Sequence, residues 1–289
     1  MLVSATTIPL DRLQHLVRQF GAAQVLASIP DAQREQVLYA WEVWARDGQQ
    51  LPAGEWRIWL ILAGRGWGKT RCGVEAVREW VKTNTWVNLI GATADDAREI
   101  MIEGESGILA KTHRSERPVY VKHERKLRWP NGAISQIFTA DEPDRLRGKQ
   151  HMKLWADELA AWKYPESWDQ AVMGLRLGTN PQAVVTTTPR PTPIIKSLIA
   201  DPLTHLTRGR TMDNVKNLAK AFVDELLKKY QGTRLGRQEL EAEVLSDHAG
   251  ALWKMAWIDS ARVPKAPPLD RVVVAVDPAT TSGPDSDDT

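Results

Sequence analysis

The residue types with the clearest chemistry gather in a glycine-rich segment, Ala63-Gly-Arg-Gly-Trp-Gly-Lys-Thr70. The segment fits the phosphate-binding loop (P-loop) pattern G-x-x-x-x-G-K-[ST], except that Ala63 stands at the first glycine. Its glycines let the backbone curl so that successive N–H groups face a phosphate. Lys69 can reach the β- and γ-phosphates of ATP, and the Thr70 hydroxyl can ligate Mg²⁺. The residues that we expect to contact ATP are Gly64, Arg65, Gly66, Trp67, Gly68, Lys69 and Thr70. The alternative is a glycine-rich turn in which the Lys-Thr pair occurs by chance.

Two adjacent carboxylates, Asp157 and Glu158, follow the apolar segment Lys153-Leu-Trp-Ala156. Strand ends that carry binding loops gather at one edge of a parallel sheet, so we expect Asp157 near Thr70, where it would bind Mg²⁺ through water. Glu158 would polarise the attacking water, because a second acid at this place marks hydrolytic P-loop enzymes. The alternative is a surface Asp-Glu pair at a helix start, where acids are favoured in any case.

A run of threonines, Thr186-Thr-Thr188, closes another apolar strand and precedes Pro189. Hydroxyl groups at a strand end can sense the γ-phosphate and relay its loss to a neighbouring segment. We expect Thr188 to have this role in catalysis. The alternative is that β-branched threonines simply finish a strand.

Short apolar runs alternate with helical patterns, and this alternation predicts the fold. We expect strands at 56–62, 86–90, 153–156 and 183–186, and helices at 69–81, 94–103, 220–230 and 235–244. Asn131-Gly132 predicts a type I′ turn in a hairpin that joins 126–129 to 133–138. Together these elements predict an α/β fold with a mainly parallel sheet that helices cover on both faces.

The chain divides into four expected regions. Residues 1–50 form an N-terminal helical region, and residues 51–262 form a P-loop ATPase domain. Residues 263–270 form a linker, because their prolines fit neither helix nor sheet. Residues 271–289 hold one β-branched strand that ends at Asp277, and we expect them to begin a second domain whose remainder is absent.

Composition excludes several classes of protein for this chain of 289 residues. No apolar stretch is long enough to span a membrane, and the N-terminus lacks the pattern of a signal peptide. The single cysteine, Cys72, excludes an internal disulfide and favours a reducing, cytoplasmic compartment. The net charge is only +2, but residues 111–153 carry 11 Lys and Arg against 5 Asp and Glu. This basic segment suits a phosphate backbone, and the alternative is a solvated charged face.

The ordered set of motifs resembles the large terminase subunit of tailed bacteriophages and related gene-transfer particles, an ATPase that packages DNA into capsids. The motifs are the phosphate-binding loop, Asp144-Arg-Leu-Arg-Gly148, Asp157-Glu158, the threonine run and the strand that ends at Asp277. The resemblance implies a P-loop NTPase fold of the additional-strand, catalytic-glutamate type with ATP and Mg²⁺. It also implies a homo-oligomeric ring at a portal, translocation of double-stranded DNA, and a small terminase subunit as partner. The place of action would be the host bacterial cytoplasm, at the procapsid portal.

The resemblance also implies roles for Arg65, Arg145, Arg147 and Asp277. Arg65 would contact the nucleotide in cis, and Arg147, with Arg145 beside it, would act in trans on a neighbouring subunit. Each would place a fixed positive charge where charge builds up on the γ-phosphoryl group. The alternative for the last two is a basic loop that binds DNA or a surface acid. Asp277 would be the first metal ligand of an RNase H-like nuclease, and we expect no nuclease activity from this chain, because one carboxylate cannot assemble a two-metal site.

Two other functions remain open at the level of sequence. One is a helicase-like ATPase that remodels nucleic acid, although few residues follow Thr188 to form a second lobe. The other is a nucleotide-binding scaffold that does not hydrolyse ATP, against which Glu158 argues.

Overall fold

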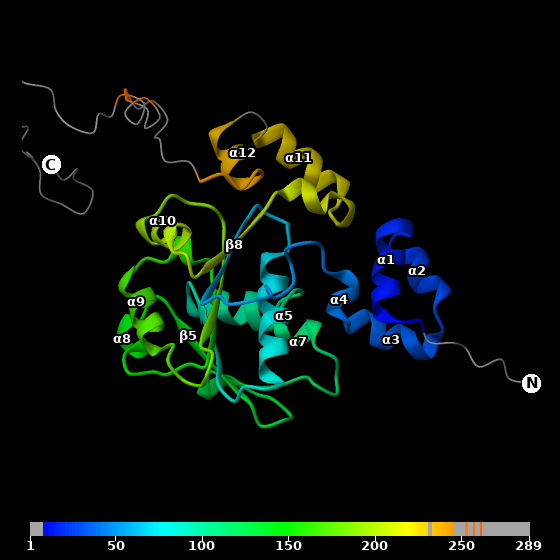
Figure 1. Cartoon of the computed structure of the whole chain (residues 1–289), viewed down its shortest axis with the longest axis horizontal. Helices are drawn as coiled ribbons and strands as arrows, with labels where there is room; N and C mark the ends of the chain where they lie inside the picture. Colours follow the sequence, from blue (N-terminus) through cyan, green and yellow to red (C-terminus); the bar gives the residue numbers. More distant parts are fainter. Residues whose placement is uncertain (1–7, 231–232, 245–251, 254–256, 258–260, 262–289) are drawn as a thin grey trace, which may run out of the picture. The chain divides into compact units, whose positions relative to one another are not determined.

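The computed structural model describes residues 8–230, 233–244, 252–253, 257 and 261 (Figure 1). Residues 1–245 form one compact unit and residues 246–289 a second. All helices and strands of the described residues that are named below lie in the first unit. The expected linker at 263–270, the strand after it and Asp277 lie outside the described residues. No helix in the described part of the chain is both long and apolar enough to span a membrane.

An eight-stranded sheet forms the centre of the fold, in the order β3-β4-β5-β2-β6-β7-β1-β8. The strands are β1 (Ile58–Ala63), β2 (Val87–Gly91), β3 (Val119–Val121), β4 (Lys126–Arg128), β5 (Ile134–Thr139), β6 (Lys153–Asp157), β7 (Gln182–Thr187) and β8 (Thr204–Gly209). Strands β5, β2, β6, β7, β1 and β8 run parallel to one another, and β3 and β4 extend the sheet beyond β5 in antiparallel pairs. Strand β7 lies between β1 and β6, so the predicted additional-strand type of P-loop fold is confirmed.

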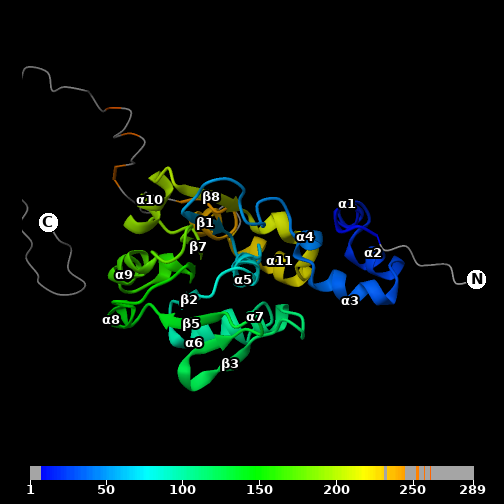
Figure 2. The same ribbon diagram turned by 60° about the horizontal axis from the view of Figure 1, so that its bottom comes forward.

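Helices cover both faces of the sheet, as the apolar strands require (Figures 1 and 2). The α-helices are α1 (Leu10–Phe20), α2 (Ala22–Ser28), α3 (Asp31–Tyr39), α4 (Trp41–Trp44), α5 (Lys69–Val81), α6 (Ala94–Asp96), α7 (Ile108–Lys111), α8 (Pro143–Leu146), α9 (Glu166–Gly174), α10 (Pro193–Ala200), α11 (Lys220–Tyr230) and α12 (Arg234–Glu239). Short turns of other helical types are η1 (Ala97–Ile102), η2 (Lys122–Glu124), η3 (Leu159–Ala161) and η4 (Thr211–Asn217).

The two faces of β1 show how the core is divided. Trp59 and Ile61 point to the side covered by α5, η1 and α7, and Leu60 points to the side covered by α8, α9 and α10. Both buried tryptophans of the central strands satisfy their indole N–H groups, Trp59 with Thr207 Oγ1 at 2.9 Å and Trp155 with Thr186 Oγ1 at 2.8 Å. These hydrogen bonds offset the cost of burying the two indole N–H groups.

The N-terminal helices α1 to α4 have a small apolar core of their own. Its buried residues are Leu13, Val25, Ile29, Val37, Ala40 and Val43. Contacts from α5 tie this region to the core around the sheet: the Arg71 guanidinium lies 5.1 Å from the ring centre of Trp41, and Arg78 Nη1 donates to the Tyr39 carbonyl at 3.4 Å.

Most expected elements are present, and three differ. The prediction of a type I′ turn is wrong, because Gly132 has a positive φ of 87° and Asn131 has none. Pro130 fixes its own φ near −65°, so the loop is a type I turn followed by a left-handed glycine. The helix expected at 235–244 ends at Glu239, and the one expected at 94–103 splits into α6 and a π-helical turn.

Candidate nucleotide-binding and hydrolysis site

The glycine-rich segment forms a loop between β1 and α5 whose backbone suits an anion. Gly66 and Gly68 have φ angles of +74° and +104°, a region that glycine enters without steric cost. No side chain caps the N-terminus of α5, a helix of 13 residues. Its first N–H groups and the positive end of its dipole are therefore available to a phosphate.

Side chains from outside the loop bind its carbonyl groups. Thr211 Oγ1 donates to the carbonyl of Arg65 at 2.8 Å, and Asn214 Nδ2 donates to that of Gly66 at 2.6 Å. The Trp67 carbonyl accepts from Gln49 Nε2 at 3.0 Å and from the Arg46 guanidinium. Three successive carbonyls thus have protein donors.

The seven loop residues differ in what they offer a nucleotide. Arg65 is exposed, Gly64 is buried at the end of β1, and Lys69 is 9% exposed. Trp67 is 2% exposed, and its indole packs on Gly209 so closely that a Cβ atom there would lie 2.2 Å from the ring. The side chain of Trp67 therefore anchors the loop to β8, and only its backbone remains for the nucleotide.

Asp157 ends β6 in a fully buried position. It is 4% exposed and accepts a hydrogen bond from Thr186 Oγ1 on β7. Burial raises the pKa of Asp157 to about 7, and the negative charge of Glu158 adds to the rise, while the Thr186 hydrogen bond and Lys69 oppose it. A cation beside this carboxylate would relieve both unfavourable effects.

Glu158 is where three of the predicted motifs meet. Its Oε1 lies 3.5 Å from Lys69 Nζ, and its Oε2 accepts from the Thr188 N–H at 3.2 Å and from Thr188 Oγ1 at 3.4 Å. Its backbone is left-handed, with φ 50° and ψ 43°, and its N–H donates to the Thr186 carbonyl at 2.6 Å. A non-glycine residue costs about 1–2 kcal/mol in this conformation. Strain of this kind is typical of functional positions.

The oxygen donors near the loop suit Mg²⁺. In the described part of the chain, no group of three His, Cys, Asp or Glu side chains is arranged to bind a metal. A Mg²⁺ ion would therefore rely on the Thr70 hydroxyl and the Asp157 carboxylate, completed by phosphate and water oxygens, which is its usual environment in nucleotide sites.

Arg145 and Arg147 lie apart from this cluster. Their side chains are 61% and 73% exposed and pair locally, Arg145 with Glu142 at 3.1 Å and Arg147 with Asp144 at 3.8 Å. They follow β5, which β2, β6 and β7 separate from β1. The role in trans expected of Arg147 stays a prediction.

Several cations of the basic segment 111–153 pair with nearby acids. Arg128 and Lys126 pair with Glu124 at 2.8 and 3.3 Å, and Lys122 pairs with Glu103 at 2.8 Å. Because Arg128 and Lys122 are exposed, their pairs are weak and can be exchanged for phosphate contacts.

Five polar residues near the site escaped prediction: Arg46, Gln49, Thr211, Asn214 and Asp96. The first four bind the loop carbonyls, and the negative charge of Asp96 contributes to the raised pKa of Asp157. The only local signal is at Asp96, where Thr93 caps α6 and donates to its carboxylate at 2.8 Å. The other four are single polar residues, two before β1 and two in the short turn η4, and follow no motif.

Comparisons with known proteins agree on one family and one fold. The family model described as "Terminase large subunit, T4likevirus-type, N-terminal" matches residues 60–260. A comparison with curated proteins gives no match. The large terminase ATPase domain of Thermus phage P74-26 is similar, with a TM-score of 0.53 and 18% identity over 66% of this chain and 90% of that one.

The large terminase of a second, thermophilic bacteriophage has the same fold. Its complex with ADP gives a TM-score of 0.55 and 15% identity over 73% of this chain, and its complex with ATP-gamma-S gives 0.55 and 16% over the same share. This chain spans about half of that protein, 53% and 52% in the two complexes.

Proposed function

This chain belongs to the terminase large subunit family of the T4likevirus type, N-terminal part, and from that membership we propose that it is the ATP-hydrolysing part of a motor that translocates double-stranded DNA into a viral procapsid. The observation that carries the proposal is the Glu158 carboxylate, which contacts Lys69 of the loop and Thr188 of the threonine run. A hydrolytic P-loop enzyme needs a phosphate-binding lysine and a carboxylate near the attacking water, and here these groups and Thr188 come from the segments that follow β1, β6 and β7.

Each residue near the loop has a defined task in this proposal. The loop N–H groups and Lys69 bind the β- and γ-phosphates of ATP, and Thr70 and Asp157 hold Mg²⁺. When bound, Mg²⁺ neutralises charge that develops on the phosphate oxygens. Glu158 orients the attacking water and accepts its proton.

The contact between Lys69 and Glu158 suggests how ATP would prepare hydrolysis. The oxygens of ATP would compete with Glu158 Oε1 for the Lys69 ammonium, 3.5 Å away. Once Lys69 binds phosphate, Glu158 Oε1 is released from this contact and can accept a hydrogen bond from the attacking water. Thr188, bound to the other carboxylate oxygen, is placed to register this change and pass it along β7.

The exposed arginines and the basic edge of the sheet are assigned to other molecules. We assign Arg147 to the nucleotide site of a neighbouring subunit in a ring, Arg65 to the nucleotide in cis, and the basic segment 111–153 to the DNA backbone. A portal ring and a small terminase subunit are the proposed partners, in the host bacterial cytoplasm. The role expected of Asp277 stays a prediction.

The experiment that tests hydrolysis compares ATP binding and ATP turnover in the Glu158→Gln variant. The amide keeps the size of the side chain but cannot accept the proton, so turnover should fall roughly 10²–10⁴-fold while ATP binding remains. A wild-type protein that binds ATP without Mg²⁺-dependent turnover would instead be a scaffold. Unwinding of a forked duplex by the wild-type protein would favour the helicase-like alternative.

A further inference from the structure

The loop carbonyls are held by two segments that lie far from each other in sequence. Arg46 and Gln49 precede Trp67 by 21 and 18 residues, whereas Asn214 follows Gly66 by 148 residues. The segments are also joined directly, because Arg46 Nη1 donates to Asn214 Oδ1. The guanidinium of Arg46 lies 5.6 Å from the ring centre of Trp67 as well. One arginine thus links the residues before β1, the loop and the residues after β8.

These contacts matter because the loop is rich in glycine. A peptide plane next to glycine can flip at little cost, since glycine adopts positive and negative φ with similar ease. A flip of the Trp67–Gly68 peptide would turn its carbonyl oxygen toward the phosphate and remove the Gly68 N–H as a donor. A flip of the Gly66–Trp67 peptide would break the hydrogen bond, 3.3 Å long, from the Trp67 N–H to the Gly64 carbonyl that closes the loop. Donors that hold the carbonyls of Gly66 and Trp67 oppose the flip, so the phosphate site is formed before ATP arrives.

We infer that Arg46 and Asn214 are positioning residues for nucleotide binding, which clamp the carbonyls of Gly66 and Trp67 away from the phosphates. This inference rests on the proposed function, because it requires that the loop binds nucleotide. It goes beyond that function, because it makes the segment before β1 part of the nucleotide site. The side chains of Arg46 and Asn214 act through the loop backbone and need not touch ATP.

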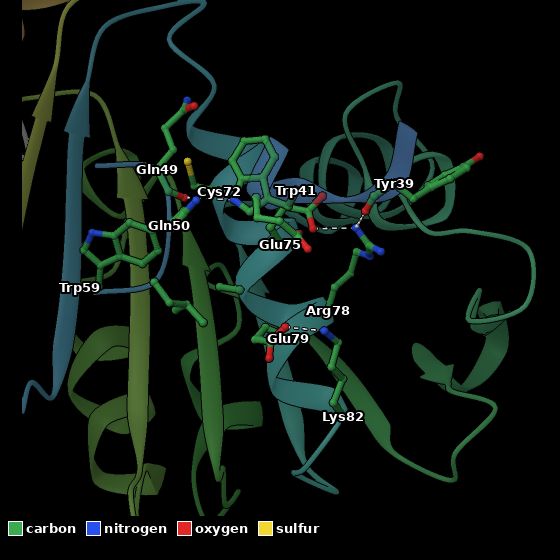
Figure 3. A pocket seen from close by; sticks show the side chains of 13 residues that line it. Tyr39, Trp41, Gln49, Gln50, Trp59, Cys72, Glu75, Arg78, Glu79 and Lys82 are labelled. Carbon is green, nitrogen blue, oxygen red and sulfur yellow. Dashed lines mark hydrogen bonds and ion pairs between the residues drawn. The ribbon is translucent and has the colours of Figure 1, made fainter. Parts of the chain in front are cut away.

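The same segment is attached to α5 farther along the helix. Figure 3 shows Arg78 reaching toward Tyr39 and Glu75, and Trp41 lying above α5, around a cavity of about 260 Å³. Tyr39 and Trp41 thus attach the segment to α5, and Arg46 and Gln49 attach it to the loop. Binding energies are reciprocal, so nucleotide in the loop must also stabilise the segment from Tyr39 to Gln49.

The test measures affinity for ADP, and KM and kcat for ATP, in the full chain. In Arg46→Ala, ADP affinity should fall and KM rise roughly tenfold, the effect of losing one or two hydrogen bonds. Because the clamp acts on binding, kcat should stay within about twofold. Arg46→Lys keeps one donor and should recover part of the affinity. Arg12→Ala, which removes an exposed arginine of α1, is the matched control and should equal wild type.

A second variant separates the clamp from general stability. Asn214→Asp keeps an acceptor for Arg46 but loses the donor to the Gly66 carbonyl, so its ADP affinity should fall. Because the carboxylate also repels phosphate, the fall must exceed that in Asn217→Asp, which adds the same charge to the same turn. Asn214 is only half-buried, so this variant tests the clamp even where Arg46→Ala does not fold. ADP should also slow hydrogen exchange in residues 41–50 of wild type and fail to do so in Arg46→Ala.

The outcomes distinguish the clamp from the nucleotide site itself. Unchanged ADP affinity in folded Arg46→Ala and in Asn214→Asp, with weakened binding in Lys69→Ala, overturns the clamp alone. Unchanged ADP affinity in Lys69→Ala overturns the site and the clamp together. A fall in kcat without a change in KM also overturns the clamp, since it would place the effect on the chemical step.

Discussion

The site around Glu158 and the basic edge, which is the basic segment from Lys111 through β3, β4, β5 and α8, differ in how their charges are held. At the site, Lys69 and Asp157 are 9% and 4% exposed, and their partners come from other strands of the sheet. At the basic edge, whose strands β3 and β5 lie in the lower part of Figure 2, Arg145 and Arg147 are mostly exposed and pair with acids three residues away.

The difference indicates which charges are complete within one chain. Buried groups with partners on several strands keep one geometry, which suits a site that must be organised before ATP binds. Exposed pairs contribute about 0–1 kcal/mol each, so their arginines can exchange an acid for another molecule at little cost. The site would therefore work within one chain, and the edge would work between molecules. Four measurements test this contrast.

The largest effect is expected for Arg147→Ala in the assembled motor. An arginine supplied in trans is worth roughly 10³–10⁵ in turnover, so the stimulated ATPase rate of the ring should fall by about that factor. The slow rate of the isolated chain should not change. Mixing Arg147→Ala with Lys69→Ala subunits should restore part of the activity, because the first supplies an intact nucleotide site and the second supplies Arg147. The trans role would be contradicted if rings of Arg147→Ala subunits alone kept full activity, or if the mixed rings recovered none.

The next effect is expected for Lys69→Ala, in the isolated chain and the ring alike. Removal of one preorganised charge at the phosphates should lower turnover roughly 10²–10³-fold. Lys82→Ala, at the exposed far end of α5, is the matched control and should keep the wild-type rate. Equal turnover in Lys69→Ala and wild type would contradict the site.

A smaller effect is expected for Thr188, which contacts Glu158 through its hydroxyl and its N–H. Thr188→Ala removes only the hydroxyl contact and should lower kcat roughly tenfold, the value of one hydrogen bond to a charged group. Thr188→Ser keeps the hydroxyl and should recover most of the rate. If serine and alanine behave alike, the hydroxyl is not part of the mechanism.

The smallest effect is expected at the basic edge in DNA binding. Replacing Arg114, Lys122 and Arg128 by Ala should reduce the slope of log affinity against log salt by about 0.9 for each phosphate that the protein no longer neutralises. The side chains of these three residues are 79%, 69% and 58% exposed. A matched triple variant on α11, at Lys220, Lys228 and Lys229, should keep the wild-type slope. An unchanged slope at the edge would leave these residues as a solvated surface.

Local patterns in the sequence were sufficient to predict most of the fold and the segments that supply the candidate site. The apolar runs of β1, β2, β6 and β7 are buried on both faces, and a buried parallel strand leaves such a run in the sequence. The helix expected at 69–81 is α5, and the glycine-rich loop precedes it as expected. Short motifs of this kind are visible because the chemistry and the backbone geometry both depend on neighbouring residues.

The tertiary structure alone decided the features that depend on contacts between distant residues. Edge strand β8 alternates between exposed and buried positions and has no apolar run, so it went unpredicted although it completes the sheet beside β1. The meeting of Lys69 with Glu158, and of Arg46 with Asn214, joins single polar side chains across 89 and 168 residues of chain. Such contacts leave no periodic pattern in the sequence, and the two partners are not sequence neighbours. They arise only when the strand order brings separate loops to one edge of the sheet.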